Sequence, residues 1–338
     1  MKKVSIVILN WNGEEMLQTF LPSVLFCSMD ADVEVCVADN GSSDGSCRLI
    51  QEEFPAVRLI RLSQNYGFAE GYNRALAEVD AEYVVLLNSD VEVTPGWLHP
   101  LTDFMDTHPE VGACQPKILS QRNRESFEYA GAAGGFLDRL GYPFCRGRIF
   151  ETVEFDYGQY DTNLPVFWAT GAALFIRLDL YREVGGLDGL FFAHMEEIDL
   201  CWRLRSRGHG IYCIPSSKVY HVGGATLKKE NPRKTFLNFR NNLLMLYKNL
   251  PANELKVVMF QRFFLDWLAA AVFVLKGDFA AARAVSRARR QYKRLRPRFD
   301  EARKENLRLT VVKDIPEKVR YSILWKNKVG RVKVFSHL

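Results

Sequence analysis

The chain has 338 residues, of which 48% are hydrophobic and 25% are charged. These fractions are ordinary for a globular protein with a real core and exclude a low-complexity chain, and the length allows one large domain with an appendage or two modest domains. The net charge of +5 is unevenly distributed, because residues 283–338 hold 18 Lys and Arg against 5 Asp and Glu and the preceding residues therefore carry −8.

The basic C-terminal segment is expected to meet an anionic surface, and charge alone leaves membrane lipid, nucleic acid and plain solvation of helices open. The seven cysteines include no C-x-x-C pair, which argues against a zinc site or a redox dithiol. The start of the chain, Met1-Lys2-Lys3 followed by a strand-like run, lacks the apolar length and cleavage site of a signal peptide. We therefore expect a reducing, cytoplasmic location.

The first 90 residues alternate between β-branched or apolar runs and segments whose apolar residues have helical spacing. The runs end in turn formers, as in Asn10-Trp11-Asn12-Gly13. Four strands alternating with three helices predict a right-handed, doubly wound α/β layer. The expected strands are 4–9, 33–38, 57–62 and 83–88, and the expected helices are 14–26, 46–54 and 69–79.

The pattern is less regular after residue 90. Residues 131–160 are rich in glycine and aromatic residues, which favours loops or short strands. In chain order, the remaining expected elements are a strand at 111–119, a buried segment with a glycine kink at 166–176, a helix at 196–207, strands at 211–214 and 218–222, and helices from Pro232 onward.

The strand that ends at Asn88-Ser89-Asp90 is uninterrupted and apolar, which is typical of a strand buried on both faces of a parallel sheet. In open α/β sheets, ligands bind at the carboxyl ends of such strands. Asn88 and Asp90 place oxygen atoms where a hard divalent cation could bind. Taken alone, the segment is equally well explained as a strand followed by a polar turn.

Asp39 ends the second expected strand, where a carboxylate can accept hydrogen bonds from a base or a ribose. On its own, an Asx-turn or a helix N-cap is the more common role. No G-x-G-x-x-G follows the first strand, which argues against a nicotinamide dehydrogenase, and G-x-x-x-x-G-K-[ST] is absent, which argues against a P-loop NTPase.

Three carboxylates, Glu196, Glu197 and Asp199, lie at the start of the helix expected at 196–207. Acidic residues there complement the helix dipole, which is the purely structural interpretation. Large apolar residues surround them, however, and a desolvated carboxylate has a raised pKa and can act as a general base near neutral pH. We favour the functional interpretation for this cluster.

His221 lies in the strand expected at 218–222. A lone histidine in a strand is more often structural than a ligand. It gains interest because the Asn88-Ser89-Asp90 turn is one carboxylate short of a two-carboxylate metal site. Imidazole suits manganese-like ions, whereas magnesium prefers oxygen ligands.

Five segments in this order resemble the family 2 glycosyltransferases with a GT-A fold, in particular the bacterial rhamnosyltransferase-like branch. The likeness spans about residues 3–245 and includes a Phe239-Arg240-Asn241 element. Each segment is short, but their joint order is specific. The segments are Ser5-Ile6-Val7-Ile8-Leu9-Asn10-Trp11-Asn12, Val37-Ala38-Asp39-Asn40-Gly41-Ser42-Ser43-Asp44-Gly45-Ser46, Asn65-Tyr66-Gly67-Phe68-Ala69 with Gly71 and Asn73, Leu87-Asn88-Ser89-Asp90, and residues 192–203.

The resemblance implies an α/β fold of the GT-A type, with a central mixed sheet flanked by helices and a C-terminal helical extension. Residues 1–250 would form the catalytic domain, with a donor half of about 1–110 and an acceptor half of about 111–250. Residues 251–338 would form a helical, basic region for membrane association or oligomerisation.

The resemblance also implies site residues. Asp39 is expected to bind the uracil or thymine ring, and Gly67 is expected to let the donor diphosphate approach closely. A divalent cation, Mg²⁺ or Mn²⁺, would be held by Asp90, with His221 as a second metal ligand. The full donor-binding set is Asn10, Asn12, Asp39, Ser42, Asp44, Asn65, Gly67, Asn88 and Asp90, and the acceptor-binding set is Trp168, Thr170, Gly171 and Arg240.

The Glu196-Glu197 pair stands where the family usually has Glu-Asp, whose second member is the catalytic base. The resemblance therefore implies that Glu197 is the base of an inverting transfer. Because Glu197 is one methylene longer than the usual Asp, Glu196 remains the alternative base. Asn88 in place of a carboxylate is common in the family.

Residues 257–275 form the most apolar stretch of the chain. A membrane-spanning helix needs about 20 mostly apolar residues without central charges, and Arg262 and Asp266 interrupt this one. We therefore predict a helix that lies in the membrane plane or packs on the core. The basic residues of 283–298 favour a membrane-surface anchor, a solvated helical face is the alternative, and no recognised motif supports nucleic acid.

The leading hypothesis is an inverting hexosyltransferase on the inner face of the plasma membrane, acting in cell-surface polysaccharide synthesis. Its partners would be a nucleotide-sugar donor, with dTDP-rhamnose or a UDP-hexose favoured, and a saccharide acceptor, expected to be lipid-linked. A homodimer is a further partner to test. The alternatives are a nucleotidyltransferase on a related sheet and a non-catalytic nucleotide-sugar-binding subunit.

Overall fold

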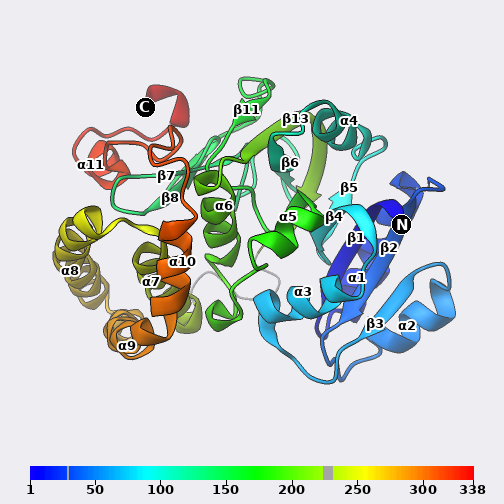
Figure 1. The fold of residues 1–338 in the computed structure, drawn as a ribbon, viewed down its shortest axis with the longest axis horizontal. Coiled ribbons are helices and arrows are strands. Elements are labelled where there is room, and N and C mark those ends of the chain that lie inside the picture. Colours follow the sequence, from blue (N-terminus) through cyan, green and yellow to red (C-terminus); the bar gives the residue numbers. More distant parts are fainter. Residues whose placement is uncertain (29, 224–230) are drawn as a thin grey trace.

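The computed structural model describes residues 1–28, 30–223 and 231–338. In this part of the chain, a nine-stranded mixed sheet runs through the centre in the order β11-β13-β6-β12-β4-β1-β2-β3, with β5 paired to β13 (Figure 1). The strands of this sheet are β1 Lys2–Asn10, β2 Val33–Asp39, β3 Arg58–Arg61, β4 Ala81–Asn88, β5 Val91–Val93, β6 Val111–Ser120, β11 Leu164–Pro165, β12 Ala173–Arg177 and β13 Gly210–His221.

The N-terminal half of the sheet is parallel and doubly wound. β1 pairs in parallel with β2 on one side and with β4 on the other, and β2 pairs in parallel with β3. β12 is antiparallel to both β4 and β6, which makes the sheet mixed. The chain changes direction across the sheet between β1 and β4, and such a switch point opens a crevice at the carboxyl ends of the strands.

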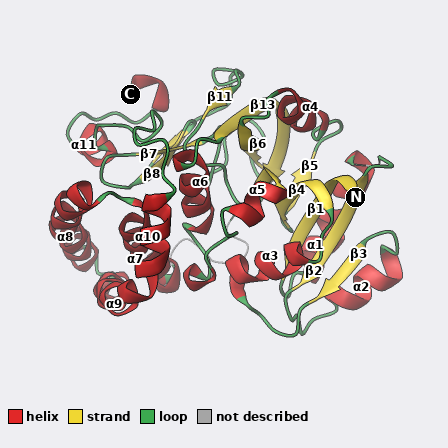
Figure 2. Cartoon of the chain, in the orientation of Figure 1, coloured by secondary structure: helices red, strands yellow, loops and turns green. Residues whose placement is uncertain are grey.

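Helices cover both faces of the sheet (Figure 2). In β4, Val84 and Leu86 belong to one apolar cluster, whereas Tyr83, Val85 and Leu87 belong to the other, as the alternation of side chains along a strand requires. The first cluster includes residues of α3 Gly67–Ala77, α5 Leu178–Glu183 and α6 Glu196–Ser206, and the second includes residues of α1 Glu14–Cys27, α2 Ser46–Glu53 and α4 His99–Thr107.

The acceptor half carries a small second sheet in the region that the sequence predicts to be loops or short strands. Its strands run in the order β10-β9-β8-β7, and each pairs in an antiparallel manner with its neighbour. The strands are β7 Gly135–Leu137, β8 Pro143–Cys145, β9 Arg148–Ile149 and β10 Thr152–Val153.

The C-terminal third is helical and packs against the rest of the molecule at the end farthest from β3 and α2 (Figure 1). The Asp138 carboxylate accepts a hydrogen bond from the Ile323 amide at 3.0 Å, and the Glu317 carbonyl accepts one from the Leu137 amide at 3.2 Å. The helices here are α7 Pro232–Asn249, α8 Ala252–Leu275, α9 Phe279–Leu295, α10 Asp300–Arg308 and α11 Ile323–Lys328. The domain division at residue 250 stays a proposal, and it falls between α7 and α8.

The fold class is confirmed, including the central mixed sheet, the flanking helices and the helical C-terminal region. One expectation was wrong: the strands expected at 211–214 and 218–222 are a single strand, β13. Its register against β6 shifts between Ile214 and Lys218, where Pro215 lacks the amide hydrogen that a regular ladder needs. The helices α4 and α5 were not predicted.

Candidate active site

The polar residues expected to bind a donor lie at one edge of the sheet. Asn10 at the end of β1 is paired in register with Asp39 at the end of β2. On the other side of β1, Leu9 is paired with Asn88 at the end of β4. The three strand ends therefore meet at the switch point between β1 and β4, where a doubly wound sheet binds its ligand.

Asp39 and Asn10 form the floor of this edge, and both side chains are buried. The Asn10 amide nitrogen lies 3.4 Å from the Asp39 carboxylate and 3.3 Å from the Ser42 hydroxyl. The second Asp39 oxygen accepts a hydrogen bond from the Ser42 backbone amide at 3.0 Å. The structure thus brings Asn10, Asp39 and Ser42 together, as expected.

Asn12 and Asp44 shape the loops above this floor. Asn12 has a φ of 51°, a left-handed conformation that asparagine tolerates well, and its side-chain oxygen accepts a hydrogen bond from the Ser43 amide at 2.7 Å. Asp44 accepts hydrogen bonds from the Glu14 amide at 3.1 Å and from the Ser46 hydroxyl at 2.6 Å, so it joins the first turns of α1 and α2. Burial alone would raise the pKa of Asp44, but these hydrogen bonds outweigh it and lower the pKa.

Gly67 has a φ of +80°, and a Cβ there would lie 2.5 Å from the Phe192 ring. A side chain at this position would therefore clash with the Phe192 ring, and close approach of the donor diphosphate stays a prediction. The Asn65 side-chain oxygen accepts a hydrogen bond from the Gly67 amide at 2.8 Å. Asn40 bonds both to the Tyr66 amide and to the Gly67 carbonyl, each at 3.0 Å, and so fixes this loop against β2.

Asp90, His221 and Asn88 converge at the end of β4. The Asp90 carboxylate lies 3.1 Å from the His221 Nε2, and the Asn88 side-chain nitrogen lies 3.4 Å from the same atom. On the other side of the imidazole, Glu128 approaches Nδ1 at 3.6 Å. Burial alone would lower the pKa of His221, but the two carboxylates raise it to about 10. The pKa of Asp90 is lowered, because the neighbouring His221 outweighs the effect of burial.

The donor set at the end of β4 fits a divalent cation that also binds phosphate. Carboxylate and amide oxygens suit Mg²⁺, and the added imidazole suits Mn²⁺. No group of three or more His, Cys, Asp or Glu side chains is arranged as a metal site within residues 1–28, 30–223 and 231–338. A cation here would therefore take Asp90 from the chain, with its remaining ligands from a bound diphosphate and water. His221 could join them only after giving up the proton that its raised pKa favours.

The turn before α6 is strained. Phe192, His194 and Met195 all have φ values between 68° and 73°, which side chains other than glycine rarely adopt. The Asn241 side chain holds this turn, because its amide nitrogen donates to the carbonyls of Phe191, Ala193 and His194 at 2.7–3.0 Å. Conformations of this kind cluster at functional sites, where surrounding contacts hold them.

Glu196 and Glu197 follow this turn at the start of α6. Glu196 is buried and Glu197 is half-buried, and one carboxylate oxygen of each lacks a hydrogen-bond partner among the described residues. Burial raises the pKa of Glu197 to about 7 and, together with the charge of Glu197, raises the pKa of Glu196 well above its ordinary value. A base that works near neutral pH needs such a pKa, and Glu197 is the less buried of the two carboxylates.

Asp199, the third carboxylate of the cluster, has a structural role. It is fully buried and forms ion pairs with Lys248 at 2.8 Å and Arg203 at 3.0 Å. Asn249 also donates to it at 2.7 Å. Burial alone would raise the pKa of Asp199, but the two cations lower it, so Asp199 stays ionised and ties α6 to α7.

Two junctions connect the carboxylates of α6 to the edge of the sheet. The Phe192 carbonyl accepts a hydrogen bond from the Phe68 amide at 2.8 Å, which joins the strained turn to the Gly67 loop. The Ala172 carbonyl accepts one from the Asn88 amide at 3.0 Å, while a Cβ on the adjacent Gly171 would lie 3.8 Å from the Glu197 Cβ. The turn before α6 and the start of α6 therefore lie beside the loops at the carboxyl ends of the strands.

The other residues expected to bind an acceptor are buried. The Trp168 indole donates to the Phe136 carbonyl at 3.0 Å and packs in the hydrophobic core. The Thr170 hydroxyl donates to the Ala130 carbonyl at 3.1 Å. Arg240 donates to the Phe191 carbonyl at 2.9 Å. Acceptor contact by Trp168, Thr170, Gly171 and Arg240 stays a prediction.

Three residues of the site were not singled out from the sequence: Glu128 beside His221, Asn40 under the Gly67 loop, and Asn241 on the strained turn. Asn40 and Asn241 do lie within segments that carry the family resemblance. Glu128 lies in the irregular region before β7, where no periodic pattern could mark it.

We expect Asn241→Ala to destabilise the protein by about 2–3 kcal/mol, because the Ala193 and His194 carbonyls lose their side-chain donor, while the Phe191 carbonyl keeps the bond from Arg240. It should also lower kcat, since the turn positions Glu197. Asn238→Ala, a half-buried residue on the same helix, is the matched control. Chemical denaturation and steady-state kinetics measure the two effects, and unchanged stability and kcat in Asn241→Ala would contradict this role of the turn.

Comparison with known proteins identifies relatives of the chain. A family model described as Glycosyl transferase family 2 matches residues 5–182, more than half of the chain. The chain is 30% identical over 234 residues, 64% of its length, to an N-acetylglucosaminyl-diphospho-decaprenol L-rhamnosyltransferase of Mycobacterium tuberculosis, and the match covers 75% of that protein.

Solved structures share the fold at low sequence identity. TarS 1–349 of S. aureus in complex with UDP has a TM-score of 0.55 and 16% identity, with coverage of 91% of this chain and 88% of that one. A mannosyltransferase of Pyrobaculum calidifontis in complex with GDP-Man and Mn²⁺ has a TM-score of 0.53 and 15% identity, with coverage of 90% and 87%. These two likenesses concern the fold alone.

Proposed function

Because the chain belongs to glycosyltransferase family 2, we propose that it transfers a hexose, L-rhamnose first, from a nucleoside diphosphate to a lipid-linked saccharide. Its relative from M. tuberculosis is named for rhamnosyl transfer to N-acetylglucosaminyl-diphospho-decaprenol, which supports this donor sugar and this class of acceptor. dTDP-rhamnose is the favoured donor, followed by a UDP-hexose. Neither a nucleotidyltransferase nor a non-catalytic subunit is favoured by these relatives.

One observation carries the mechanism: Glu197, a half-buried carboxylate whose pKa burial raises to about 7, follows the turn that is hydrogen-bonded to Phe68, next to Gly67. In the proposed inverting transfer, Glu197 takes the proton of the acceptor hydroxyl while that oxygen bonds to the anomeric carbon. The bond from the anomeric carbon to the diphosphate oxygen breaks, and the nucleoside diphosphate leaves with the electron pair. Glu196 remains the alternative base.

The other site residues bind and orient the donor in this proposal. Asp39 accepts a hydrogen bond from the pyrimidine ring, with Ser42 and Asn10 fixing the carboxylate. Asp90 and His221 would hold a divalent cation, Mg²⁺ or Mn²⁺. When bound, such a cation offsets the negative charge that develops on the departing diphosphate.

We also propose that the protein associates peripherally with the cytoplasmic face of a membrane through α8. Among the described residues, α8 is the one helix that is long and apolar enough to cross a membrane by length and composition. Its two central charges, Arg262 and Asp266, are buried and paired with each other at 3.2 Å, and Arg262 also donates to the Leu140 carbonyl at 3.0 Å. The face of α8 that carries Arg262 and Asp266 therefore packs against the rest of the protein.

The opposite face of α8 is exposed and apolar. A contiguous patch of this kind marks a protein or lipid contact, and neighbouring basic residues favour anionic lipid. The basic helix α9 packs against α8 and supplies that charge. We call these side chains the α8 face: Val257, Phe260, Phe263, Phe264, Trp267, Leu268, Val272, Val274 and Leu275.

Two introduced charges on the α8 face should abolish membrane binding. We expect Phe264→Glu/Leu268→Glu to remain in solution when vesicles of phosphatidylethanolamine and phosphatidylglycerol are sedimented, while the wild type sediments with them. Phe26→Glu/Trp325→Glu, on exposed apolar residues elsewhere, is the matched control. If the α8 face instead pairs two chains, the wild type would be a dimer without lipid and the α8 variant a monomer by analytical ultracentrifugation.

Transfer itself is tested with purified protein, Mn²⁺ or Mg²⁺, a panel of dTDP- and UDP-sugars, and a short-chain polyprenyl-diphospho-N-acetylglucosamine acceptor. We expect a glycosylated lipid with inverted anomeric configuration and an equal amount of released nucleoside diphosphate. Absence of transfer from every donor, or release of pyrophosphate, would contradict the proposal.

A further inference from the structure

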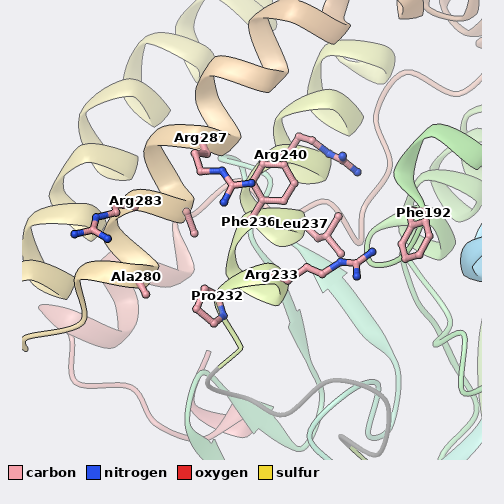
Figure 3. Close-up of a pocket in the computed structure, with 10 residues that line it drawn as sticks. Phe192, Pro232, Arg233, Phe236, Leu237, Arg240, Ala280, Arg283 and Arg287 are labelled. Atoms are coloured by element: carbon pink, nitrogen blue, oxygen red, sulfur yellow. The ribbon is translucent and has the colours of Figure 1, made fainter.

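A basic pocket lies between α7 and α9, next to the strained turn before α6 (Figure 3). Its volume is about 670 Å³, which is in the range of pockets that bind small ligands. Four arginines line it: Arg233 and Arg240 from α7, and Arg283 and Arg287 from α9. The rest of the lining is aromatic or aliphatic, and Phe192 forms the wall toward the active site.

The pocket carries positive charge that the described carboxylates do not pair with. Within the described ranges, no carboxylate forms an ion pair with any of the four arginines, whereas the buried Arg203 and Arg262 each pair with an aspartate. Arg240 is 7% exposed, and its guanidinium donates to neutral oxygens, among them the Phe191 carbonyl and the Gln291 side chain. A buried guanidinium without a counter-ion is costly, so Arg240, with the three exposed arginines beside it, favours an anion in the pocket.

Aromatic rings orient the guanidinium groups. Arg240 and Arg287 lie over the Phe236 ring at 5.3 Å and 5.4 Å, and Arg233 lies over the Phe192 ring at 4.9 Å. Figure 3 shows Arg240 and Arg287 gathered at Phe236 and Arg233 directed toward Phe192, with Arg283 at the outer rim. Planar guanidinium groups placed in this way suit phosphate oxygens, to which arginine can donate two hydrogen bonds at once.

The apolar surroundings indicate which kind of phosphate fits. Ala280 in the pocket wall follows the exposed Phe279, and Leu275 of the α8 face precedes the same turn. The pocket is therefore lined by Phe192 on one side, and its Ala280 side follows in the chain directly after the exposed apolar end of α8. In a lipid-linked saccharide, a diphosphate stands between an apolar chain and the accepting sugar, which matches this sequence of environments.

We propose that the pocket between α7 and α9 binds the diphosphate of the lipid-linked acceptor and so places the accepting sugar beside Glu197. This inference rests on the function proposed above. The donor also carries a diphosphate, but a nucleoside and a sugar flank it, and neither offers an apolar chain to the exposed α8 face.

The test compares two acceptors in detergent solution: a short-chain polyprenyl-diphospho-N-acetylglucosamine, and N-acetylglucosamine on an uncharged alkyl chain. The variant is Arg233→Gln/Arg287→Gln, since both side chains are exposed and their loss should not prevent folding. Lys293→Gln/Arg294→Gln, exposed residues of α9 outside the pocket, removes the same charge as a control.

We expect the pocket variant to have a KM for the diphosphate acceptor that is raised about tenfold or more. The variant should then no longer prefer the diphosphate acceptor over the uncharged acceptor. KM for the nucleotide sugar should stay at the wild-type value, and the control should keep the wild-type preference. A raised KM for the nucleotide sugar would assign the pocket to the donor diphosphate and overturn the inference, as would an equal loss with both acceptors.

These outcomes separate the inference from the proposed function. If the wild type transfers sugar to the diphosphate acceptor but the pocket variant does so with unchanged KM, the inference fails and the function stands. If the wild type transfers to neither acceptor, the function itself fails. A loss that appears only with phosphatidylglycerol vesicles, and not in detergent, would assign the arginines to a phospholipid headgroup and overturn the inference.

Discussion

Glu197→Gln is expected to lower kcat by about 10³-fold while leaving the affinity for the nucleotide sugar unchanged. General-base catalysis contributes about 10²–10⁴-fold, and the amide of glutamine cannot accept the proton of the acceptor hydroxyl. Donor affinity should persist because the strand ends at Asn10, Asp39 and Asn88 are separate from α6. Single-turnover kinetics and calorimetric titration of the donor measure the two quantities.

The pH dependence of the wild type gives a second test of the same residue. Burial raises the pKa of Glu197 to about 7, and the base acts only when it is ionised. The value of kcat/KM should therefore fall about tenfold for each pH unit below 7 and level off above it. A profile that is flat between pH 5 and 8 would be inconsistent with a base of this pKa.

The same pKa shift predicts a stability effect. A carboxyl group whose pKa is raised on folding stabilises the folded state in its protonated form, and this contribution is lost as the pH rises through about 7. Glu197→Gln, which keeps the neutral form at every pH, should melt at a higher temperature than the wild type above pH 7. Below about pH 4.5 the two should melt alike, because both side chains are then neutral.

Glu196→Gln is the matched comparison. Glu196 is fully buried, and its raised pKa favours the protonated form, so replacing it by the neutral amide should change kcat little. If Glu196→Gln loses transfer and Glu197→Gln retains it, the base is Glu196 and the two assignments are exchanged.

The sequence allowed the fold and the strand-end residues to be predicted, because both depend on local patterns. Continuous apolar runs ending in Asn10, Asp39 and Asn88 indicate parallel strands and their common edge without further information. The structure confirms the fold class that these patterns predict. Asp39, Asp90 and Glu197 are far apart in the chain, and only the family resemblance joined them into one site before the structure was known.

What could not be predicted depends on contacts between distant, irregular segments. Asn241 on α7 bonds to the turn before α6, and Glu128 in a loop lies beside His221. Neither contact corresponds to a periodic pattern of residues in the sequence. Arg262 and Asp266 were taken as interruptions of an apolar helix. The structure shows that both lie on one buried face, so the opposite face stays continuous and apolar.

Asp90→Ala is expected to abolish the dependence of donor affinity on the metal and to lower kcat/KM by about 10³-fold, which corresponds to about 4 kcal/mol of transition-state stabilisation. Asp90 is the carboxylate at the end of β4, and its lowered pKa keeps it ionised and able to bind a cation at neutral pH. Without it, His221 and the Asn88 amide cannot neutralise a cation next to the diphosphate.

The measurement is calorimetric titration of dTDP and UDP with and without Mn²⁺. The wild type should bind one of them more tightly when Mn²⁺ is present, and Asp90→Ala should bind it equally weakly in both conditions. Glu92→Ala is the control, because Glu92 lies on the adjacent β5 and pairs with Arg124 at the surface. Tighter binding with Mn²⁺ that survives in Asp90→Ala would place the cation elsewhere.

Glu128 approaches Nδ1 of His221, the ring nitrogen that faces away from Asp90. Glu128→Gln should therefore weaken the increase in donor affinity caused by Mn²⁺ without removing it.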